Sequence, residues 1–341
     1  MIKLEKSIIF LVACLTLLMA EVANACTRFT YTGPDNTVVT GRSMDWVEDI
    51  KTELWVFPAG ITRTGSAGAN SVKWTSKYGS VIASGYNLGM TDGINVKGLG
   101  VNLLYLATSD YGKPRAERKD LSVFIWLQYV LDNYASVAEA VKDLSQDQFN
   151  MIAPTLPNGA SPSVHLALAD PSGDNAILEY VAGKLVIHHD KKFKVMTNEP
   201  TYDKQLVLND YWENLKGVFL PGTDDPADRF VRTSYYLNAA PQTSDEQISV
   251  AAVFSIIRNI SVPFSAKTSD RPNVASTLWR SVADLKHNVY YFESSDRPNV
   301  FWVELSKLDL KAKAPIKKLP LVNNEVYAGE VSKHFVQSKP F

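Results

Sequence analysis

The chain contains 341 residues, of which 45% are hydrophobic and 21% are charged, and its formal net charge is -1. This is the composition of a globular protein, and the balanced charge gives no sign of nucleic acid or an anionic membrane surface as a partner. The length is enough to bury the core of one large domain or of two smaller ones.

The first 25 residues have the organisation of a signal peptide. Two lysines precede an apolar run over residues 8–20, and Ala23 and Ala25 have the small-x-small spacing after which a signal peptidase cuts. The apolar run is short for a membrane span, and no later stretch is apolar for long enough. The sequence therefore predicts a cleaved signal peptide over residues 1–25, export to the bacterial periplasm or beyond, and no stable membrane insertion of the mature chain.

Cleavage after Ala25 makes Cys26 the first residue of the mature chain. That residue then carries a thiol that can attack and an α-amine, with a pKa of roughly 7.7–8.0, that can accept the thiol proton. The chain has two cysteines, and because Cys14 lies in the leader, the mature chain has a single thiol and no internal disulfide. These features favour an enzyme with an N-terminal nucleophile.

A cysteine directly after a leader is also the residue that is lipidated in bacterial lipoproteins, which would block its amine. The alternative function is therefore an exported, lipid-anchored binding protein without catalysis. Lipoprotein leaders favour leucine or a similar large residue three positions before the cysteine, whereas this chain has Ala23. The leader therefore favours simple cleavage, and the mass of the mature N-terminus distinguishes the two.

The mature chain opens with predicted strands. Residues 28–32 and 37–42 are β-prone and joined by a Gly-Pro-Asp-Asn turn, which predicts a hairpin that starts next to Cys26. Residues 60–71 are rich in Gly, Ser, Thr and Ala, which predicts a loop. Further strands are predicted over residues 54–57, 80–86 and 101–107.

Helices and strands then follow in blocks. Helical spacing predicts a helix over residues 121–134 with Ser122 near its start, and Ser136 is placed to cap a second helix that runs through Leu144. The later predicted elements are strands over residues 164–169, 176–181 and 184–188, helices over 202–215, 228–237 and 245–260, and strands over 276–284, 289–293 and 300–304. This order lacks the βα alternation of a parallel sheet, so it predicts an α+β fold of antiparallel sheets with helices outside them.

Common catalytic signatures are absent from the sequence. It contains no P-loop, zinc-protease, dithiol or serine-hydrolase motif, and its five histidines are scattered, so no metal or cofactor is expected. Arg42 and Asp45, at the end of the predicted hairpin, are candidates to assist Cys26. Arg42 would lower the pKa of the thiol or the amine, and Asp45 would hold the α-ammonium. Their spacing alone favours a structural Arg–Asp pair at the surface.

Five short motifs occur together along the mature chain. They are Cys26-Thr-Arg, Gly41-Arg-Ser-Met-Asp45, Asp92-Gly-Ile-Asn-Val-Lys-Gly-Leu-Gly100, Met196-Thr-Asn-Glu-Pro-Thr-Tyr202 and Asp228-Arg-Phe230. In this order and approximate spacing they resemble the choloylglycine hydrolase family of N-terminal nucleophile hydrolases, which includes penicillin V acylases and conjugated bile salt hydrolases. The resemblance implies a single domain over residues 26–341, folded as a four-layer αββα sandwich of two antiparallel sheets flanked by helices.

The resemblance also implies roles for individual residues. Cys26 is implied as the nucleophile, with its own amine as the base. Asn198 falls at the position of the oxyanion-hole asparagine, and Arg229 at that of an arginine that supports the site electrostatically. Tyr105 falls where penicillin V acylases carry tyrosine and many bile salt hydrolases carry asparagine, and its backbone N–H can donate to an oxyanion.

The implied reaction is hydrolysis of a linear amide through an acyl-enzyme, on a small N-acyl substrate with an apolar acyl part and without a metal or cofactor. Arg42 and Asp45 fall at the family's positions beside the thiol and the amine. The candidates to line the acyl pocket are Trp46, Trp55, Tyr86 and Tyr105.

Tyr105 favours penicillin V acylase activity over conjugated bile salt hydrolysis, and acyl-homoserine lactone cleavage is a third possibility. The segment between Tyr211 and Asp228 is shorter than in the family's Gram-positive members, where a longer insertion helps to assemble the tetramer. This difference and the export leader are similar to the Gram-negative branch. A homo-oligomer is expected, and the family suggests a tetramer.

Overall fold

A computed structural model describes residues 26–341, with the exception of residues 157, 158, 160, 216–218, 265–273, 298 and 324. The predicted signal peptide, residues 1–25, lies outside the described residues and stays a prediction.

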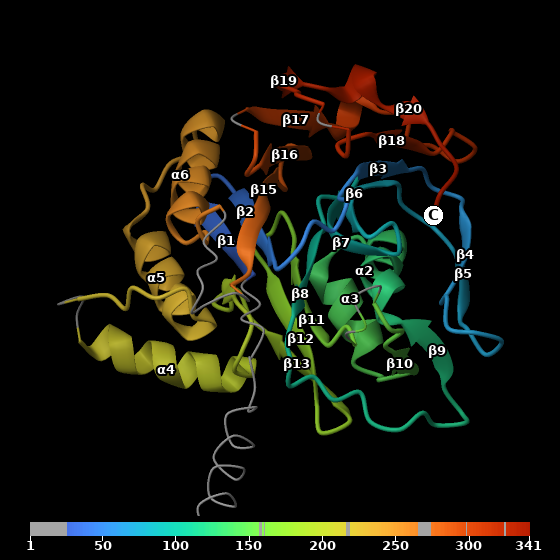
Figure 1. Cartoon of the computed structure of the whole chain (residues 1–341), viewed down its shortest axis with the longest axis horizontal. Coiled ribbons are helices and arrows are strands. Elements are labelled where there is room, and N and C mark those ends of the chain that lie inside the picture. The colour runs from blue at the N-terminus through green and yellow to red at the C-terminus, as the bar shows by residue number, and fades with distance from the viewer. Residues whose placement is uncertain are drawn as a thin grey trace, which may run out of the picture.

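Two large β-sheets lie face to face in the centre of the protein (Figure 1). The first sheet contains β1 (Thr27–Gly33), β2 (Thr37–Trp46), β14 (Val195–Met196), β15 (Ser276–Asp284), β16 (Val289–Ser294), β17 (Val300–Glu304) and β19 (Gly329–Glu330). Its seven strands follow the order β14-β1-β2-β15-β16-β17-β19, and all neighbours are antiparallel except β17 and β19. The hairpin predicted next to Cys26 is therefore confirmed as β1 and β2.

The second sheet has nine strands, all paired antiparallel. They are β3 (Leu54–Phe57), β6 (Ser80–Gly85), β7 (Gly89–Asn95), β8 (Gly100–Tyr105), β11 (Val164–Ala169), β12 (Asn175–Val181), β13 (Lys184–His189), β18 (Lys317–Leu319) and β20 (Val336–Gln337). Their order is β13-β12-β11-β8-β7-β6-β3-β18-β20.

Helices cover the outer face of each sheet. The helices are α2 (Val123–Asn133), α3 (Val137–Leu144), α4 (Tyr202–Asn214), α5 (Pro226–Ala239) and α6 (Glu246–Asn259). α2 packs on β7 and β8 of the nine-stranded sheet, whereas α5 and α6 pack on β1 and β2 of the seven-stranded sheet, with α4 against α5 (Figure 1). The predicted four-layer αββα sandwich is confirmed. Short 3-10 helices span Leu305–Lys307 and Ser332–His334.

Local sequence signals explain several of these boundaries. The hydroxyl of Ser122 accepts a hydrogen bond from the backbone N–H of Phe124 at the start of α2, and Ser136 caps α3 in the same way. The loop predicted over residues 60–71 is partly wrong, because β4 (Thr62–Thr64) pairs with β5 (Lys73–Thr75). A further short pair, β9 (Lys119–Ser122) and β10 (Phe149–Ile152), was not predicted.

Candidate active site

Cys26 lies directly before β1, in the interior of the sandwich, and only 2% of its surface is exposed. Its backbone nitrogen donates a hydrogen bond to the Asn198 side-chain oxygen, at 2.5 Å. Its sulfur lies 3.8 Å from the Met44 sulfur and 3.6 Å from the Asp45 carbonyl oxygen. Burial raises the pKa of the Cys26 thiol, and the positive charge of Arg42 partly opposes that rise.

Arg229, on α5, fixes both Cys26 and Asn198. One guanidinium nitrogen donates to the Cys26 carbonyl oxygen at 2.6 Å and to the Thr27 hydroxyl, and the other donates to Asn198 Oδ1 at 3.0 Å. Because a guanidinium only donates, Arg229 sets the orientation of the Asn198 amide. Asn198 Nδ2 therefore faces β8, where it donates to the Tyr105 carbonyl oxygen at 2.7 Å.

Tyr105 is the last residue of β8 and lies opposite Val164 of β11. The N–H of Leu106 donates to Ser163, so the alternation of an antiparallel pair turns the N–H of Tyr105 away from β11. The N–H and the C=O of one strand residue point to the same side, and the Tyr105 C=O faces Asn198. The Tyr105 N–H and the Asn198 amide therefore share one side of β8.

Strand alternation separates Arg42 from Asp45. Arg42, Met44 and Trp46 face the pocket described below, whereas Ser43 and Asp45 face the other side of β2. The surface Arg–Asp pair that spacing favoured is therefore wrong, because both residues are buried and they lie on opposite faces of one strand.

The Asp45 carboxylate is held by hydroxyl groups. It accepts hydrogen bonds from Thr277 at 2.5 Å and Ser43 at 3.1 Å. Burial raises the pKa of Asp45 to about 6, although the charge of Arg229 lowers it. The oxygen that accepts from the Cys26 nitrogen in the structure belongs to Asn198, and the expected contact of Asp45 with the α-ammonium of the mature chain stays a prediction.

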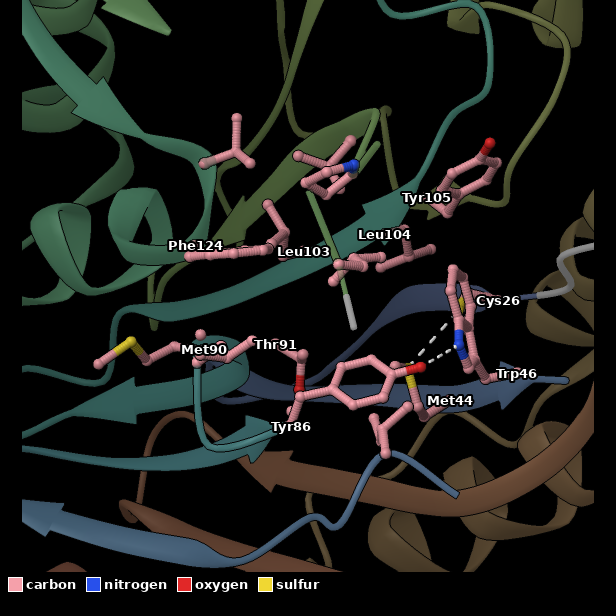
Figure 2. Close-up of a pocket in the computed structure, with 18 of the residues that line it drawn as sticks. Cys26, Met44, Trp46, Tyr86, Met90, Thr91, Leu103, Leu104, Tyr105 and Phe124 are labelled. Atoms are coloured by element: carbon pink, nitrogen blue, oxygen red, sulfur yellow. Dashed lines mark hydrogen bonds between the residues drawn. The ribbon is translucent and has the colours of Figure 1, made fainter. Parts of the chain in front are cut away.

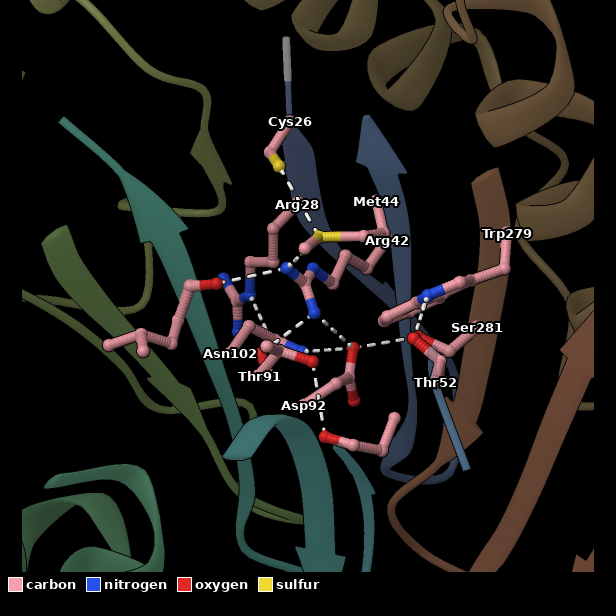
Figure 3. Close-up of polar contacts among 12 residues, drawn as sticks. Cys26, Arg28, Arg42, Met44, Thr52, Thr91, Asp92, Asn102, Trp279 and Ser281 are labelled. Atoms are coloured by element: carbon pink, nitrogen blue, oxygen red, sulfur yellow. Dashed lines mark hydrogen bonds and ion pairs between the residues drawn. The ribbon is translucent and has the colours of Figure 1, made fainter. Parts of the chain in front are cut away.

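Arg42 reaches the Cys26 sulfur through Met44 (Figure 3). Its Nη2 donates to the Met44 sulfur at 3.1 Å and to the Leu103 carbonyl oxygen at 2.9 Å, and its Nη1 donates to the Thr91 carbonyl oxygen at 2.7 Å. Met44 was not among the predicted site residues. The period of two along β2, which places Met44 on the same face as Arg42, was the signal that could have identified it.

A pocket opens beside the Cys26 sulfur (Figure 2). The structure places Trp46, Tyr86 and Tyr105 on its wall, with the rings of Trp46 and Tyr105 edge to face at 5.8 Å. The Trp46 indole N–H donates to the Tyr86 hydroxyl at 2.8 Å, and this hydroxyl donates to Glu48. The rest of the wall is mostly apolar and includes Ile50, Met90, Leu103, Phe124, Leu156 and Val164.

Trp55 does not line this pocket, and its predicted place is wrong. Successive side chains of β3 point to opposite faces, so Leu54 and Val56 enter the core between the sheets. Trp55 and Phe57 instead face the helical side, where their rings stack at 5.9 Å.

A group of possible metal ligands lies elsewhere in the described part of the chain. Side-chain atoms of Glu246, Asp284 and His287 lie within 4.8 Å of one another. His287 and Asp284 are hydrogen bonded to each other at 2.8 Å, and none of the three lines the pocket beside Cys26. The absence of a metal from the reaction stays a prediction.

Comparison with known proteins defines first the class and then the family. Residues 26–318 match the linear amide C–N hydrolases of the choloylglycine hydrolase family. The chain is therefore a hydrolase that acts on carbon–nitrogen bonds of linear amides. It belongs to the choloylglycine hydrolase family, as the five motifs suggested.

Individual relatives agree with this assignment. The chain is 47% identical to a penicillin V acylase of Pectobacterium atrosepticum, over 100% of this chain and 99% of the relative. The solved structure of a penicillin V acylase from Agrobacterium tumefaciens is 49% identical, with a TM-score of 0.87 over 93% of this chain and 98% of the other. A conjugated bile acid hydrolase from Clostridium perfringens, 22% identical, shares the fold with a TM-score of 0.73 over 89% of this chain and 98% of the other.

Within the described residues, the structure contains no helix whose length and apolar character would allow it to cross a membrane.

Proposed function

We propose that the mature chain, cleaved after Ala25, hydrolyses the amide bond of a small N-acyl substrate of the penicillin V type through an acyl-enzyme on Cys26. One observation carries this proposal. The sulfur of Cys26 lies on the wall of an apolar pocket, and the nitrogen of the same residue is hydrogen bonded to Asn198. The similarity to penicillin V acylases over the whole chain supports the choice of substrate class.

In the proposed first step, the α-amine of Cys26 takes the proton of its own thiol. Removal of the leader converts the nitrogen of residue 26 from an amide, which is not a base, into an amine that titrates near neutral pH. Asn198 holds Cys26 through its backbone nitrogen, and Arg229 holds it through its carbonyl oxygen. The sulfur then attacks the carbonyl carbon of the substrate.

The tetrahedral intermediate needs donors for its oxyanion. Asn198 Nδ2 has two N–H groups, of which one donates to the Tyr105 carbonyl oxygen. The second N–H and the backbone N–H of Tyr105 lie on the same side of β8, which makes them the proposed oxyanion hole. The ammonium of Cys26 next gives its proton to the leaving nitrogen, and water releases the acid from the sulfur.

The acyl group of the substrate would enter the apolar pocket. The edge-to-face pair of Trp46 and Tyr105, together with the hydrogen bond from Trp46 to Tyr86, forms aromatic walls on which a flat aryl group can stack. We therefore propose Trp46, Tyr86 and Tyr105 as substrate-binding residues. A rigid steroid acid requires a wider apolar opening than these walls suggest.

A substrate panel on one preparation of mature protein tests this choice. We expect a higher kcat/KM for phenoxyacetyl amides than for glycine-conjugated bile acids or acyl-homoserine lactones. One pocket contact is worth about 1–3 kcal/mol, so the expected preference is roughly 10- to 200-fold. A clear preference for either of the other two substrates would replace the proposed substrate and leave the chemistry at Cys26 in place.

Export and self-association complete the proposal. Cleavage in the periplasm would leave a free amine on Cys26, whereas lipidation would add a diacylglycerol, and the mass of the N-terminal peptide separates these outcomes.

Exposed apolar side chains on and beside α4 and α5 support self-association through this face, and light scattering measures the resulting mass. These side chains are Val207, Leu208, Tyr211, Phe219 and Tyr235.

A further inference from the structure

Asp92 begins one of the five motifs, yet the proposed reaction gives it no role. It lies on β7 and is 2% exposed. Its Oδ2 accepts hydrogen bonds from Ser281 at 2.8 Å and Asn102 at 3.1 Å, and it forms an ion pair with Arg42 at 3.4 Å (Figure 3). These partners come from β15, β8 and β2, so one buried carboxylate joins both sheets beneath the active site.

The ion pair with Asp92 restricts one edge of the Arg42 guanidinium. Nη1 faces Asp92 and the Thr91 carbonyl, while Nη2 faces the Leu103 carbonyl and the Met44 sulfur. Because the guanidinium is planar and its donors have fixed directions, holding the Nη1 edge also sets the direction of the Nη2 edge. Met44 in turn contacts the Cys26 sulfur at 3.8 Å.

Burial raises the pKa of Asp92, and the positive charge of Arg42 opposes that rise and so favours the carboxylate, which in turn offsets the charge of Arg42. Arg42, Asp45 and Arg229 are the charged side chains that act on the pKa of the Cys26 thiol, and Arg42 lowers it. Two further groups face Asp92. Arg28 donates at 3.0 Å to Oδ1 of Asn102, the amide whose Nδ2 donates to Asp92. The phenol of Tyr290 is buried, and its pKa is raised.

We propose that Asp92 is a positioning residue of the active site, which holds the Arg42 guanidinium beneath the Cys26 sulfur and limits how much of its positive charge the thiol experiences. This inference rests on the proposed role of Cys26 as the nucleophile. Asp92 does not line the pocket, whereas Arg42 and Met44 do. Its influence is therefore exerted on the reacting sulfur rather than on the binding of the acyl group.

The experiment uses the mature protein, in which Cys26 is the only cysteine. The rate of alkylation by iodoacetamide is measured against pH for the wild type and for Asp92→Asn, which keeps the size of the side chain and removes its charge. The expected direction of the shift follows from electrostatics. Without the negative charge of Asp92, the positive charge of Arg42 favours the thiolate form of Cys26 more strongly. We expect the midpoint of the alkylation profile to move to lower pH by roughly half to one unit. In amide hydrolysis, kcat should change while KM stays within about twofold of the wild type.

Asp132→Asn is the matched control. Asp132 is another fully buried aspartate that pairs with an arginine, Arg63, at 3.0 Å, and it lies on α2 without lining the pocket. If Asp92 only held the sheets together, both variants would lose stability and neither would move the alkylation midpoint. We expect the midpoint to move for Asp92→Asn alone.

A second neutral variant keeps the test decisive if Asp92→Asn does not fold. Asp92→Ser removes the same charge with a smaller side chain, and the same shift is expected. A folded Asp92 variant whose midpoint equals that of the wild type, or moves to higher pH, would overturn the inference. Alkylation reports on the thiol without any substrate, so an error in the proposed substrate would leave this result readable.

Discussion

At the scale of single residues, the surroundings of Cys26 explain why its own amine is the proposed base. Burial raises the pKa of the thiol, so at neutral pH the sulfur keeps its proton until a base removes it. The described side chains hydrogen bonded to Cys26 are those of Asn198, Met44 and Arg229, and none of them is a base at this pH. In the proposed mechanism, the α-amine released by cleavage fills this role.

Replacing the thiol should remove turnover without removing the fold. Cys26→Ala leaves a small residue after the cleavage site and deletes one sulfur atom, so the thermal midpoint should change little. Cys26→Ser should keep very little activity, because a hydroxyl is much harder to deprotonate than a thiol. Hydrolysis rates and circular dichroism melts of both mature variants check this. Turnover at the wild-type rate in Cys26→Ala would end the thiol hypothesis.

Asp45 should make the stability of the protein depend on pH. Its pKa rises from 3.8 to about 6 on folding, so the folded state binds a proton more tightly than the unfolded state between these values. Stability therefore falls as the pH rises through this window, by about 3 kcal/mol from this group. Asp45→Asn lacks the effect. The free energy of unfolding of Asp45→Asn minus that of the wild type, both measured in urea, should therefore rise by about 3 kcal/mol between pH 4 and pH 7. A constant difference across this range would contradict the assigned environment.

At the scale of elements, strand alternation decides which residues of the motifs meet. The motifs and the family resemblance predicted Cys26, Arg42, Asn198 and Arg229 as site residues. The structure brings these four residues together. They did not identify Met44, although it lies two residues from Arg42 on the same strand. They also gave no role to Asp92, because its contact with Arg42 joins strands of different sheets that are 50 residues apart in sequence. Trp55 was misplaced because being aromatic says nothing about the face of β3 on which a residue lies.

β7 shows why part of the fold could not be predicted. Its sequence, Gly-Met-Thr-Asp-Gly-Ile-Asn, has few β-branched or aromatic residues, and yet it forms a central strand beneath α2. Packing requires its glycines, since a Cβ at Gly93 would lie 2.7 Å from both Ile82 and the Val81 carbonyl oxygen. The helices α2 and α3, in contrast, were predicted close to their observed bounds because apolar spacing and a serine cap are local signals.

Gly93→Ala should therefore destabilise the protein. The added methyl group has to displace β6, the neighbouring strand of the same sheet, and overpacking of this kind costs about 1–3 kcal/mol. Gly222→Ala is the control, because no atom lies within 4 Å of the Cβ it would add. Urea titrations of both variants measure the difference. Equal stability of the two would show that β6 and β7 are packed less tightly than described.

At the scale of the whole molecule, the site exists only in the folded sandwich. Cys26 precedes β1 in one sheet, Tyr105 ends β8 in the other, Asn198 follows β14, and Arg229 comes from α5 in an outer layer. Hydrogen bonds join all four, across a sequence separation of up to 203 residues. In the proposed maturation, cleavage after Ala25 then provides the base within this assembled site.

The central claim is that cleavage after Ala25 creates the catalytic base, and one rate comparison tests it directly. The full-length chain is prepared with Ala23 and Ala25 changed so that the leader stays attached, and its mass is confirmed before the assay. Its rate of phenoxyacetyl amide hydrolysis is then compared with that of the mature protein. We expect no hydrolysis by the intact precursor, because an amide nitrogen at residue 26 cannot accept the thiol proton. Hydrolysis by the intact precursor at the mature rate would contradict the claim.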